Sequence, residues 1–282
     1  MVRRDPRVLG QRQTRWTLGA IRERCARWLD IGSDSGLYRL LRRLGITYKR
    51  GRSYVHSPDP DYHEKRSYIA DKRQEATRAG QETIFLYQDE CTYYRQPTLA
   101  KGYEAQGSGV QPRADLGHSG EATSRITGAL DAHTGNVVYS QADKMGTDGL
   151  IRFYRKVCRA YSEADRVYLV QDNWPVHFHA DLIGKLQKQK WPWPMRVPSN
   201  WPDVPTGPQV EDPMPIQLLC LPTYASWLNP IEKLWRWLKQ EVIHLHRLAA
   251  EFDRLKGQVG AFLDRFAGGS KKLLRYTGLL PE

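Results

Sequence analysis

The sequence predicts a mixed α/β fold preceded by a small, basic helical module, and three observations carry this prediction. Short apolar runs rich in β-forming residues occur at 83–90, 167–170 and 216–222. Amphipathic helical patterns alternate with the later runs, as is typical of α/β domains. The net charge of +12 is concentrated at one end: residues 1–78 contain 19 Lys and Arg against 9 Asp and Glu, whereas 79–282 contain 24 against 22.

This charge distribution predicts a polyanion-binding module joined to a body with another role. The alternative is a basic face that is merely solvated. A chain of 282 residues with 40% hydrophobic residues can bury one sizeable core beside a small extra module.

Composition excludes several other classes of protein. No apolar run approaches the ~20 residues needed to span a bilayer, and the Arg-rich N-terminus contains no hydrophobic signal segment. We therefore expect a cytoplasmic, nucleoid-associated protein with no membrane partner. The cysteines are widely scattered without a CxxC pair, which argues against structural zinc and against a disulfide scaffold. They are Cys25, Cys91, Cys158 and Cys220.

The N-terminal module begins with a basic arm, residues 1–16, that has no periodicity. Thr17 can cap a first helix, and Ser33 or Ser35 can cap a second helix that Gly45 ends. The predicted apolar stripes are Leu18, Ile21, Cys25 and Trp28 or Leu29 in the first helix, and Leu37, Leu40, Leu41 and Leu44 in the second.

A short basic hairpin is expected at residues 46–57, after the second helix. Helix, turn, Arg-bearing helix and basic hairpin in this order form the outline of a winged helix-turn-helix. Such a helix can lie in the DNA major groove while the hairpin touches phosphates. The alternative is a helical subdomain that only packs. The side chains assigned to DNA binding are Arg39, Arg42 and Arg43 on the helix and Lys49, Arg50 and Arg52 on the hairpin.

A linker follows the module. Residues 57–61 (SPDPD) begin it, and 61–80 form a polar helix with little to bury. The predicted domains are 1–56, the DNA-binding module; 57–81, the linker helix; 82–260, the catalytic body; and 261–282, a C-terminal tail.

The body should contain strands and helices in a defined order. We expect a strand at 83–90, a second at 101–106, a hairpin of 126–130 and 137–139, a helix at 148–161, a strand at 167–170, a helix at 178–188 and a last strand at 216–222. Three antiparallel-type strands followed by helix, strand, helix, strand and helix give a mixed sheet. This is the order of an RNase H-like fold.

An irregular insertion interrupts this order. Residues 189–216 contain eight prolines and three tryptophans among 28 residues. If the segment loops out, its tryptophans can stack on nucleobases or on a second subunit. The alternative is inert packing.

The segment from Asn229 to His246 reads as one amphipathic helix. Asn229 is a natural N-cap and Pro230 suits the first helical position. Glu232 falls in the first turn, where the helix dipole favours a carboxylate. The apolar face comprises Leu228, Ile231, Leu234, Trp235, Leu238, Val242 and Leu245.

Three carboxylates can converge at one edge of the sheet. Asp89 and Asp172 each follow a buried strand, and Glu232 lies on the helix after a third. Such carboxylates repel one another unless a cation lies between them. Oxygen ligands without Cys or His favour Mg²⁺ or Mn²⁺ over zinc. Two such ions ~3.5–4 Å apart can activate a water or a 3′-hydroxyl for in-line displacement at a phosphodiester.

The segments YQDE around Asp89, VQDNWPVH around Asp172 and LPTYASWLNPIEKLWRWLK around Glu232 resemble the catalytic segments of the DDE transposases. The resemblance is to the insertion sequence 630 branch of the mariner-like superfamily, and TLGAIRERC…LYRLLRRLGITYKR is similar to that family's second helix-turn-helix. It implies an RNase H-like fold, with Asp89 and Asp172 as shared ligands of two metal ions and Glu232 as the third ligand. It also implies cut-and-paste transposition at TA by a bacterial protein, a homodimer bound to terminal inverted repeats.

The chain departs from the family pattern in two places. Asp172 and Glu232 are 60 positions apart, a wider spacing than is usual, and the 189–216 insertion can supply the difference. Family members also carry a further N-terminal helix-turn-helix that we do not find. The second departure affects the recognition of transposon ends more than it affects catalysis.

Other polar residues are assigned supporting roles. Glu90 should face the side of its strand opposite to Asp89. Asn173 and His177 match the family segment and can orient a ligand or touch DNA, and Asn229 is placed with them. The pairs His177/His179 and His244/His246 are interpreted as structural, and Asp131 as a turn former.

The sequence thus predicts a metal-dependent DDE transposase that cleaves DNA at transposon ends and joins the 3′-OH to target DNA. Substrate binding should be salt-sensitive, because it depends on neutralised phosphates. Two alternatives are an RNase H-like nuclease that does not transpose and a catalytically silent DNA-binding regulator. The presence of all three acids argues against the regulator.

Overall fold

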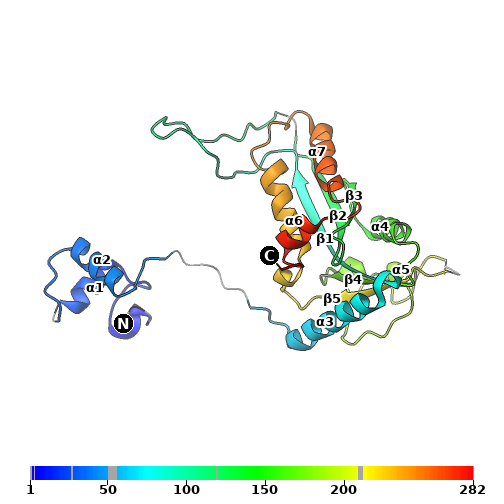
Figure 1. Ribbon diagram of the computed structural model, residues 1–282, viewed down its shortest axis with the longest axis horizontal. Coiled ribbons are helices and arrows are strands. Elements are labelled where there is room, and N and C mark those ends of the chain that lie inside the picture. Colours follow the sequence, from blue (N-terminus) through cyan, green and yellow to red (C-terminus); the bar gives the residue numbers. More distant parts are fainter. Residues whose placement is uncertain are drawn as a thin grey trace. The chain divides into compact units, whose positions relative to one another are not determined.

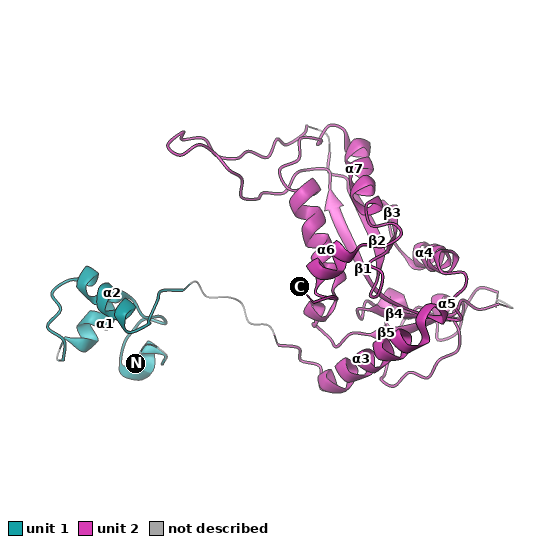
Figure 2. Cartoon of the chain, viewed as in Figure 1, with its two compact units in different colours: residues 1–55 teal, residues 56–282 magenta. Residues whose placement is uncertain are grey.

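The computed structural model describes residues 2, 4–26, 28–49, 56–118, 120–208 and 212–281. The chain forms two compact units, Met1–Val55 and His56–Glu282 (Figure 2). The first contains the predicted DNA-binding module, and the second contains the predicted α/β body.

The first unit contains the two helices that the sequence predicts. Their caps are also as predicted: the hydroxyl of Thr17 accepts from the backbone N–H of Ala20 at 3.2 Å, and that of Ser33 accepts from Gly36 at 3.1 Å. The helices are α1 (Leu18–Cys25) and α2 (Asp34–Arg43), preceded by the 3₁₀ turn Pro6–Leu9.

The apolar stripes of these helices are shorter than predicted. Ile21, Cys25 and Leu37 form the buried core of the unit. Trp28 and Leu44, which the prediction placed in the stripes, are 71% and 62% exposed. Each helix ends before the residue in question, so the helical spacing no longer turns that side chain inward. The predicted hairpin falls largely on residues 50–55, which lie outside the described part of the chain.

A five-stranded mixed sheet organises the second unit (Figure 1). The strand order is β3-β2-β1-β4-β5. Strands β1, β2 and β3 are antiparallel, and β1, β4 and β5 are parallel. The strands are β1 (Thr83–Tyr94), β2 (Thr123–Asp131), β3 (Val137–Ala142), β4 (Arg166–Gln171) and β5 (Ile216–Cys220). This is the predicted RNase H-like arrangement.

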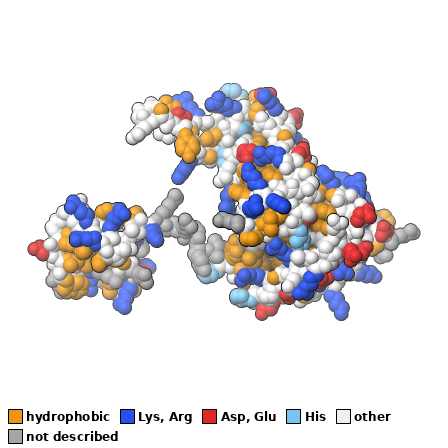
Figure 3. Space-filling model, viewed as in Figure 1, with side chains coloured by type: hydrophobic (Ala, Val, Ile, Leu, Met, Phe, Trp, Pro, Cys, Tyr) orange, Lys and Arg blue, Asp and Glu red, His pale blue; other side chains and the backbone are white. Residues whose placement is uncertain are grey.

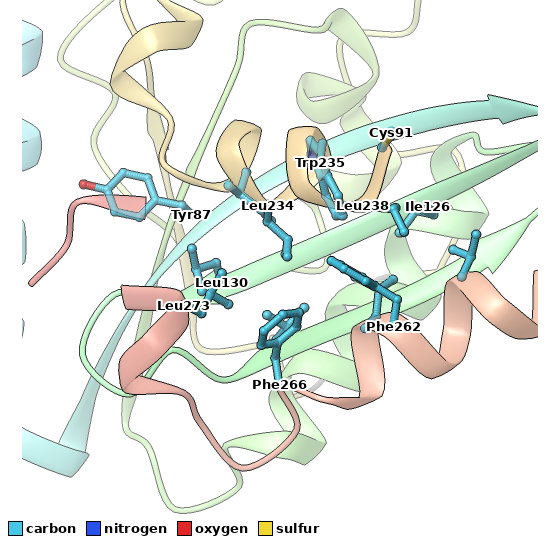
Figure 4. Packing of buried hydrophobic residues seen from close by; sticks show 14 of the residues in the cluster. Tyr87, Cys91, Ile126, Leu130, Leu234, Trp235, Leu238, Phe262, Phe266 and Leu273 are labelled. Atoms are coloured by element: carbon cyan, nitrogen blue, oxygen red, sulfur yellow. The ribbon is translucent and has the colours of Figure 1, made fainter. Parts of the chain in front are cut away.

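Helices cover both faces of the sheet. One face packs against α3 (Tyr62–Ala79), α6 (Ile231–Leu238), α7 (Phe252–Asp264) and α8 (Lys271–Thr277). The opposite face packs against α4 (Thr147–Ala160) and the short α5 (Ala180–Ile183). Side chains along β1 alternate between the two clusters, as the two-residue period of a strand requires. Figure 4 shows the α6 side, where Leu234, Trp235 and Leu238 meet Ile126 and Leu130 of β2.

Three predicted elements differ from the structure. Residues 101–106 form no strand, because they belong to a long loop in which Gly107 and Gly109 take positive φ angles. The helix predicted at 178–188 is only a 3₁₀ turn, Pro175–Phe178, followed by α5. It ends at Gly184, where the insertion folds back and places Pro205 so close that a Cβ would lie 2.6 Å from its Cγ.

The helix predicted from Asn229 to His246 is shorter and changes type. Helix α6 begins at Ile231 and continues after Leu238 as a π-helical turn, Lys239–Ile243. There the chain turns to join the β1–β2 loop: the N–H of Leu245 donates to the carbonyl of Thr98 at 3.1 Å, and Leu245 takes a φ of 52°. His244 bonds the Thr98 hydroxyl at 2.7 Å, a structural contact.

All three tryptophans of the insertion contact aromatic rings of the second unit. Trp191 packs on Phe178 with a centroid distance of 5.9 Å, and Trp193 packs on Tyr68 at 5.5 Å. Trp201 lies 4.9 Å from the ring of His179. These contacts favour the packing role of the insertion over the stacking role.

The C-terminal residues, predicted to be a tail, are helical and contribute to the core. Helix α7 runs across residue 260, where the catalytic body was expected to end, and Phe262 and Leu263 are buried. Leu273 and Leu274 of α8 are also buried. No helix within the described ranges is both long and apolar enough to cross a bilayer.

A buried ion pair attaches the start of α3 to the rest of the second unit. Asp59 Oδ2 accepts from Lys65 Nζ and from the backbone N–H of Thr223, each at 2.7 Å. Burial alone would raise the pKa of Asp59, but the hydrogen bonds from Lys65, Thr223 and Asp61 outweigh burial and hold it below its usual value. The pair thereby ties the start of α3 to the loop between β5 and α6.

Replacing Asp59 with asparagine should lower the free energy of unfolding by about 3–5 kcal/mol, because the charge of Lys65 would stay buried without its partner. Urea denaturation at pH 7 measures this, with Asp61→Asn as the control, since the Asp61 side chain makes no capping bond. The folded pKa of Asp59 is lowered, so the wild-type advantage should be present above about pH 4 and lost as the pH falls further. A difference that persists unchanged at pH 3 would contradict this explanation.

Candidate active site

The parallel pairing of β1 and β4 places two acids side by side. Tyr87 lies opposite Val170 in this pairing, and both side chains belong to the α6-side core. Asp89 lies two residues after Tyr87, and Asp172 lies two residues after Val170. Because side chains alternate along a strand, both acids are expected on the same face of the sheet as Tyr87 and Val170. Helix α6 covers that face and carries Glu232 in its first turn. The structure thus brings the three predicted carboxylates to one edge of the sheet.

The electrostatics of the three acids reflect this convergence. Burial raises the pKa of Asp89 to about 8, and the negative charges of Glu232, Glu90 and Asp172 contribute to the rise. Burial also raises the pKa of Glu232; Lys239 and Arg236 oppose that rise, and the charge of Asp172 adds to it. Without a cation, the site therefore retains protons that isolated carboxylates would release.

A tryptophan on α6 fixes the Asp89 side chain. The indole Nε1 of Trp235 donates to Asp89 Oδ2 at 2.9 Å. The ring reaches this position because Gly128 faces it from β2, in register with Asp89. A Cβ at position 128 would lie 2.7 Å from Trp235 Cη2. Sequence reasoning placed Trp235 in the apolar stripe and missed this contact, since neither residue alone signals it.

Asp172 is the exposed member of the set, with a side chain that is 53% accessible. Its Oδ1 accepts from the backbone N–H of Trp174 at 2.9 Å. Asn173, which we expected to orient a ligand or touch DNA, donates through Nδ2 to the carbonyl of Leu221 at 2.7 Å. That bond holds the loop after β4 against the end of β5.

Asn229 does not cap α6 as predicted. Its buried side chain donates through Nδ2 to the carbonyl of Gln88 at 3.0 Å, next to Asp89 on β1. Asn229 therefore joins the start of α6 to the strand that carries the first acid. The N–H of Glu232 donates to the Asn229 backbone carbonyl at 3.2 Å, so the same residue links Glu232 to Asp89.

Glu90 lies next to His177, and both are close to Asp172. The side chain of Glu90 accepts from Gln88 Nε2 at 2.6 Å, and His177 Nε2 lies 3.3 Å from the same oxygen. One ligand atom from each of Glu90, Asp172 and His177 lies within 4.8 Å of the others. Glu90 shares its strand face with Gln88, opposite to that of Asp89, as predicted.

The predicted DNA-binding side chains lie on the first unit. Arg39, Arg42 and Arg43 are exposed on α2, and Lys49 is exposed in the irregular segment that follows. Figure 3 shows Lys and Arg side chains over the visible surface of this unit. Arg50 and Arg52 lie outside the described residues. DNA binding by these six residues stays a prediction.

The second unit has an RNase H-like fold with three acids at one edge of its sheet, the arrangement expected of a nuclease of the DDE class. The family model of the DDE superfamily endonucleases matches residues 84–256, more than half of the chain, and the chain belongs to this family. A curated relative from Shigella sonnei, an insertion element IS630 uncharacterized 39 kDa protein, is 21% identical over 279 residues. The match covers 98% of this chain and 72% of the relative.

Solved structures support the same fold. A crystal structure of the Mos1 mariner paired end complex with Mn matches at a TM-score of 0.61 and 16% identity, covering 98% of this chain and 74% of that one. The Mos1 strand transfer complex matches at 0.58 and 16% identity, covering 98% and 73%. The predicted membership of the DDE group, with its resemblance to insertion sequence 630 proteins, is confirmed.

Replacing Trp235 with phenylalanine should slow metal-dependent DNA cleavage by the folded protein by about 10- to 100-fold. The smaller ring also leaves space beside Gly128, so the free energy of unfolding should fall as well. The substitution keeps an aromatic ring at position 235 but removes the N–H that holds Asp89, and a hydrogen bond to a charged group is worth about 1.5–3 kcal/mol. Trp237→Phe is the matched control, because the Trp237 indole donates to Glu241 instead. Equal cleavage rates for the two variants would contradict the role given to Trp235.

Proposed function

We propose that this endonuclease is a transposase that cleaves DNA at the ends of a mobile element and joins the freed 3′-OH to target DNA, using two Mg²⁺ or Mn²⁺ ions. The observation that carries the proposal is the convergence of Asp89, Asp172 and Glu232 at one sheet edge. The Shigella sonnei relative is an insertion element protein, and the Mos1 structures contain paired transposon ends with Mn and a strand transfer complex.

The residues at the edge suit hard divalent cations. Three carboxylates offer oxygen ligands of the type that Mg²⁺ and Mn²⁺ take. Their mutual repulsion, which contributes to the raised pKa of Asp89, is relieved when positive charge lies between them. When bound, the ions would lower the pKa of the attacking water or hydroxyl and stabilise the leaving oxygen.

The surrounding side chains prepare the acids for this task. Trp235 fixes Asp89 Oδ2, so the first ligand is held before the substrate arrives. Asp89 must release its proton to serve as a ligand, because its pKa of about 8 keeps the carboxyl protonated at neutral pH. Asp172 is open to solvent, so a cation held by its carboxylate would be accessible to a phosphate of the substrate. The Glu232 carboxylate lies in the field of Lys239 and Arg236, which favours its charged form.

DNA recognition is assigned to the first unit. The exposed arginines of α2 and the basic segment after it would contact terminal inverted repeats, and phosphate contacts by such side chains position a protein on a duplex. Cut-and-paste transposition at TA by a homodimer, in the bacterial cytoplasm at the nucleoid, is the form of the reaction that the family resemblance favours.

The test is cleavage of a plasmid that carries the element's own ends, with Mg²⁺ or Mn²⁺, by the wild type and by Asp172→Ala and Glu232→Ala. We expect cuts at the ends that need the metal and are lost in both variants. Glu163→Gln is the matched control, an exposed acid on the surface loop before β4. Strand transfer is scored in the same reaction from products joined to a second plasmid.

Other outcomes would point to a different metal ligand or to a different function. Cleavage that survives Glu232→Ala would remove Glu232 from the metal site. Cleavage without strand transfer would favour a nuclease that does not transpose. Binding of the ends without cleavage by the wild type would favour a DNA-binding regulator.

A further inference from the structure

A second group of polar side chains lies on the face of the sheet edge opposite to the α6 side. Gln88 and Glu90 alternate with Asp89 along β1, so they project toward the α4 side. His177 lies in the 3₁₀ turn after β4, five residues beyond Asp172. The proposed ligand set leaves all three of these side chains unused.

Glu90 and His177 connect the two chain segments that carry the strand-end acids. Glu90 directly follows Asp89, and its Oε1 lies 3.3 Å from Nε2 of His177. The side chain of His177 is only 1% exposed and that of Glu90 is 17% exposed, so little water competes for the contact. A displacement of either segment would have to break this contact. The pair therefore limits how far the segments of Asp89 and Asp172 can move apart.

A neighbouring side chain on the same strand holds the Glu90 carboxylate in place. Gln88 is fully buried and donates through Nε2 to Glu90 Oε1 at 2.6 Å. Gln88 is the register neighbour of Gln171 on β4, because Tyr87 lies opposite Val170. The buried amides of Gln88 and Gln171 are thus neighbours on the α4 side of the sheet. The hydroxyl of Tyr154 on α4 donates to Gln171 Oε1 at 2.7 Å.

The second ring nitrogen of His177 faces Asp172. Nδ1 lies 3.8 Å from Asp172 Oδ1 and is buried without a hydrogen-bond partner among the described residues. Buried polar atoms are usually paired, so an unpaired one beside a functional carboxylate calls for an explanation other than packing. Asp172 is also the exposed acid of the three. One side of the Asp172 carboxylate faces solvent, and the His177 imidazole lies on its other side.

We propose that Glu90 and His177 are positioning residues that hold Asp89 and Asp172 at the separation their shared cation needs. The contact between His177 Nε2 and Glu90 ties the segment that carries Asp172 to the strand that carries Asp89. Trp235 holds Asp89 from the α6 side, so the edge is fixed from both faces of the sheet. Partners that orient metal ligands in this way typically change metal affinity or activity by about 10- to 100-fold when they are replaced. This role rests on the function proposed above.

Two substitutions at one position separate positioning from packing. His177→Gln keeps an amide nitrogen where Nε2 meets Glu90, whereas His177→Asn keeps one only where Nδ1 lies. The full chain of each variant is titrated with Mn²⁺ by calorimetry, and its melting temperature is measured in EDTA. We expect His177→Asn to raise the Mn²⁺ dissociation constant by about 10- to 100-fold and His177→Gln to retain most of the wild-type affinity.

Further variants control for the effects of a histidine replacement on stability and for the loss of the Glu90 charge. His133→Asn replaces an exposed histidine that bonds Thr77 at 2.8 Å, away from the acids, and should leave the dissociation constant unchanged. Glu90→Gln and Glu90→Ala both remove the same charge, so the difference between their affinities reports the contacts of this side chain with His177 and Gln88. We expect the alanine variant to bind Mn²⁺ more weakly than the glutamine variant. This pair decides the matter if His177→Asn does not fold.

Several results would overturn the proposal. Wild-type affinity in both His177→Asn and Glu90→Ala would do so, as would a loss of affinity that follows only from loss of folded protein. A ¹⁴N coupling from His177 in the pulsed EPR spectrum of bound Mn²⁺ would make His177 a ligand instead. No Mn²⁺ binding by the wild type would remove the proposed cation site and this role with it, whereas normal wild-type binding with unchanged variants would remove only this role.

Discussion

Asp89→Asn is expected to abolish DNA cleavage and yet to stabilise the metal-free protein near neutral pH. Cleavage should fall by on the order of 10³-fold or more, because the variant loses a carboxylate ligand and a bound cation supplies several kcal/mol of transition-state stabilisation. The gain in stability follows from the raised pKa of Asp89, about 8 instead of 3.8. An ionised carboxylate is disfavoured at this position, and an amide has no charge to bury.

The sign of the pH dependence follows from proton counting. Between pH 4 and pH 8 the folded wild type keeps the Asp89 proton, whereas the unfolded chain has released it. Stability rises with pH only where the unfolded state binds more protons, so here it falls as the pH rises. The slope approaches about 1.4 kcal/mol per pH unit from this group alone. The asparagine variant lacks this slope.

Urea denaturation in EDTA at pH 5, 6, 7 and 8 measures the effect. The difference between the variant and the wild type should widen steadily toward pH 8, and saturating Mn²⁺ should narrow it by stabilising only the wild type. Glu163→Gln serves again as the control, with no widening expected. A variant that is less stable than the wild type at pH 8 would show that Asp89 is not held in its neutral form.

The acids themselves could be predicted because each one has a local signal. Asp89 and Asp172 end short apolar runs, and the ends of neighbouring parallel strands lie together in any sheet that contains both. Glu232 stands in the first turn of a strongly amphipathic helix. These patterns depend on residues a few positions apart in the chain, which a sequence shows directly.

The side chains that hold the acids could not be predicted in the same way. Trp235 has the spacing of a core residue, and its second use, the bond to Asp89, depends on a glycine that lies opposite in β2. Asn229 looks like a helix cap, but β1 passes close enough to take its amide. Each of these contacts joins segments about 100 or more positions apart, and no local pattern encodes the pairing.

The loops and the C-terminal helices show a different limit. Residues 101–106 were expected to form a strand, but glycines in left-handed conformations follow them and none of the strands in the described part of the chain pairs with them. The sequence does not predict that helices α7 and α8 belong to the core of the body. Their apolar residues gain that meaning only when the sheet face that they cover is known. Their burial against β2 and β3 is a tertiary effect.

Replacing Arg39, Arg42 and Arg43 with glutamine is expected to weaken binding to terminal-repeat DNA by about 10²-fold or more at low salt. The three guanidinium groups are exposed on α2, whose apolar side faces the small core around Leu37, so their removal leaves the packing of the first unit intact. If each neutralises one phosphate, each releases about 0.9 of a counterion on binding. The slope of log affinity against log salt should then become shallower by about 2 to 3.

The measurement is a titration of DNA affinity with salt between 50 and 200 mM. Over this range the affinity of a protein with many phosphate contacts usually falls by about 10³-fold or more. The matched control replaces Arg152, Arg155 and Arg159, three exposed arginines at helical spacing on α4, and so changes the net charge by the same amount. If long-range charge alone controlled binding, both triple variants would lose affinity equally. A specific contact through α2 requires the change in slope to appear in the first variant and not in the second.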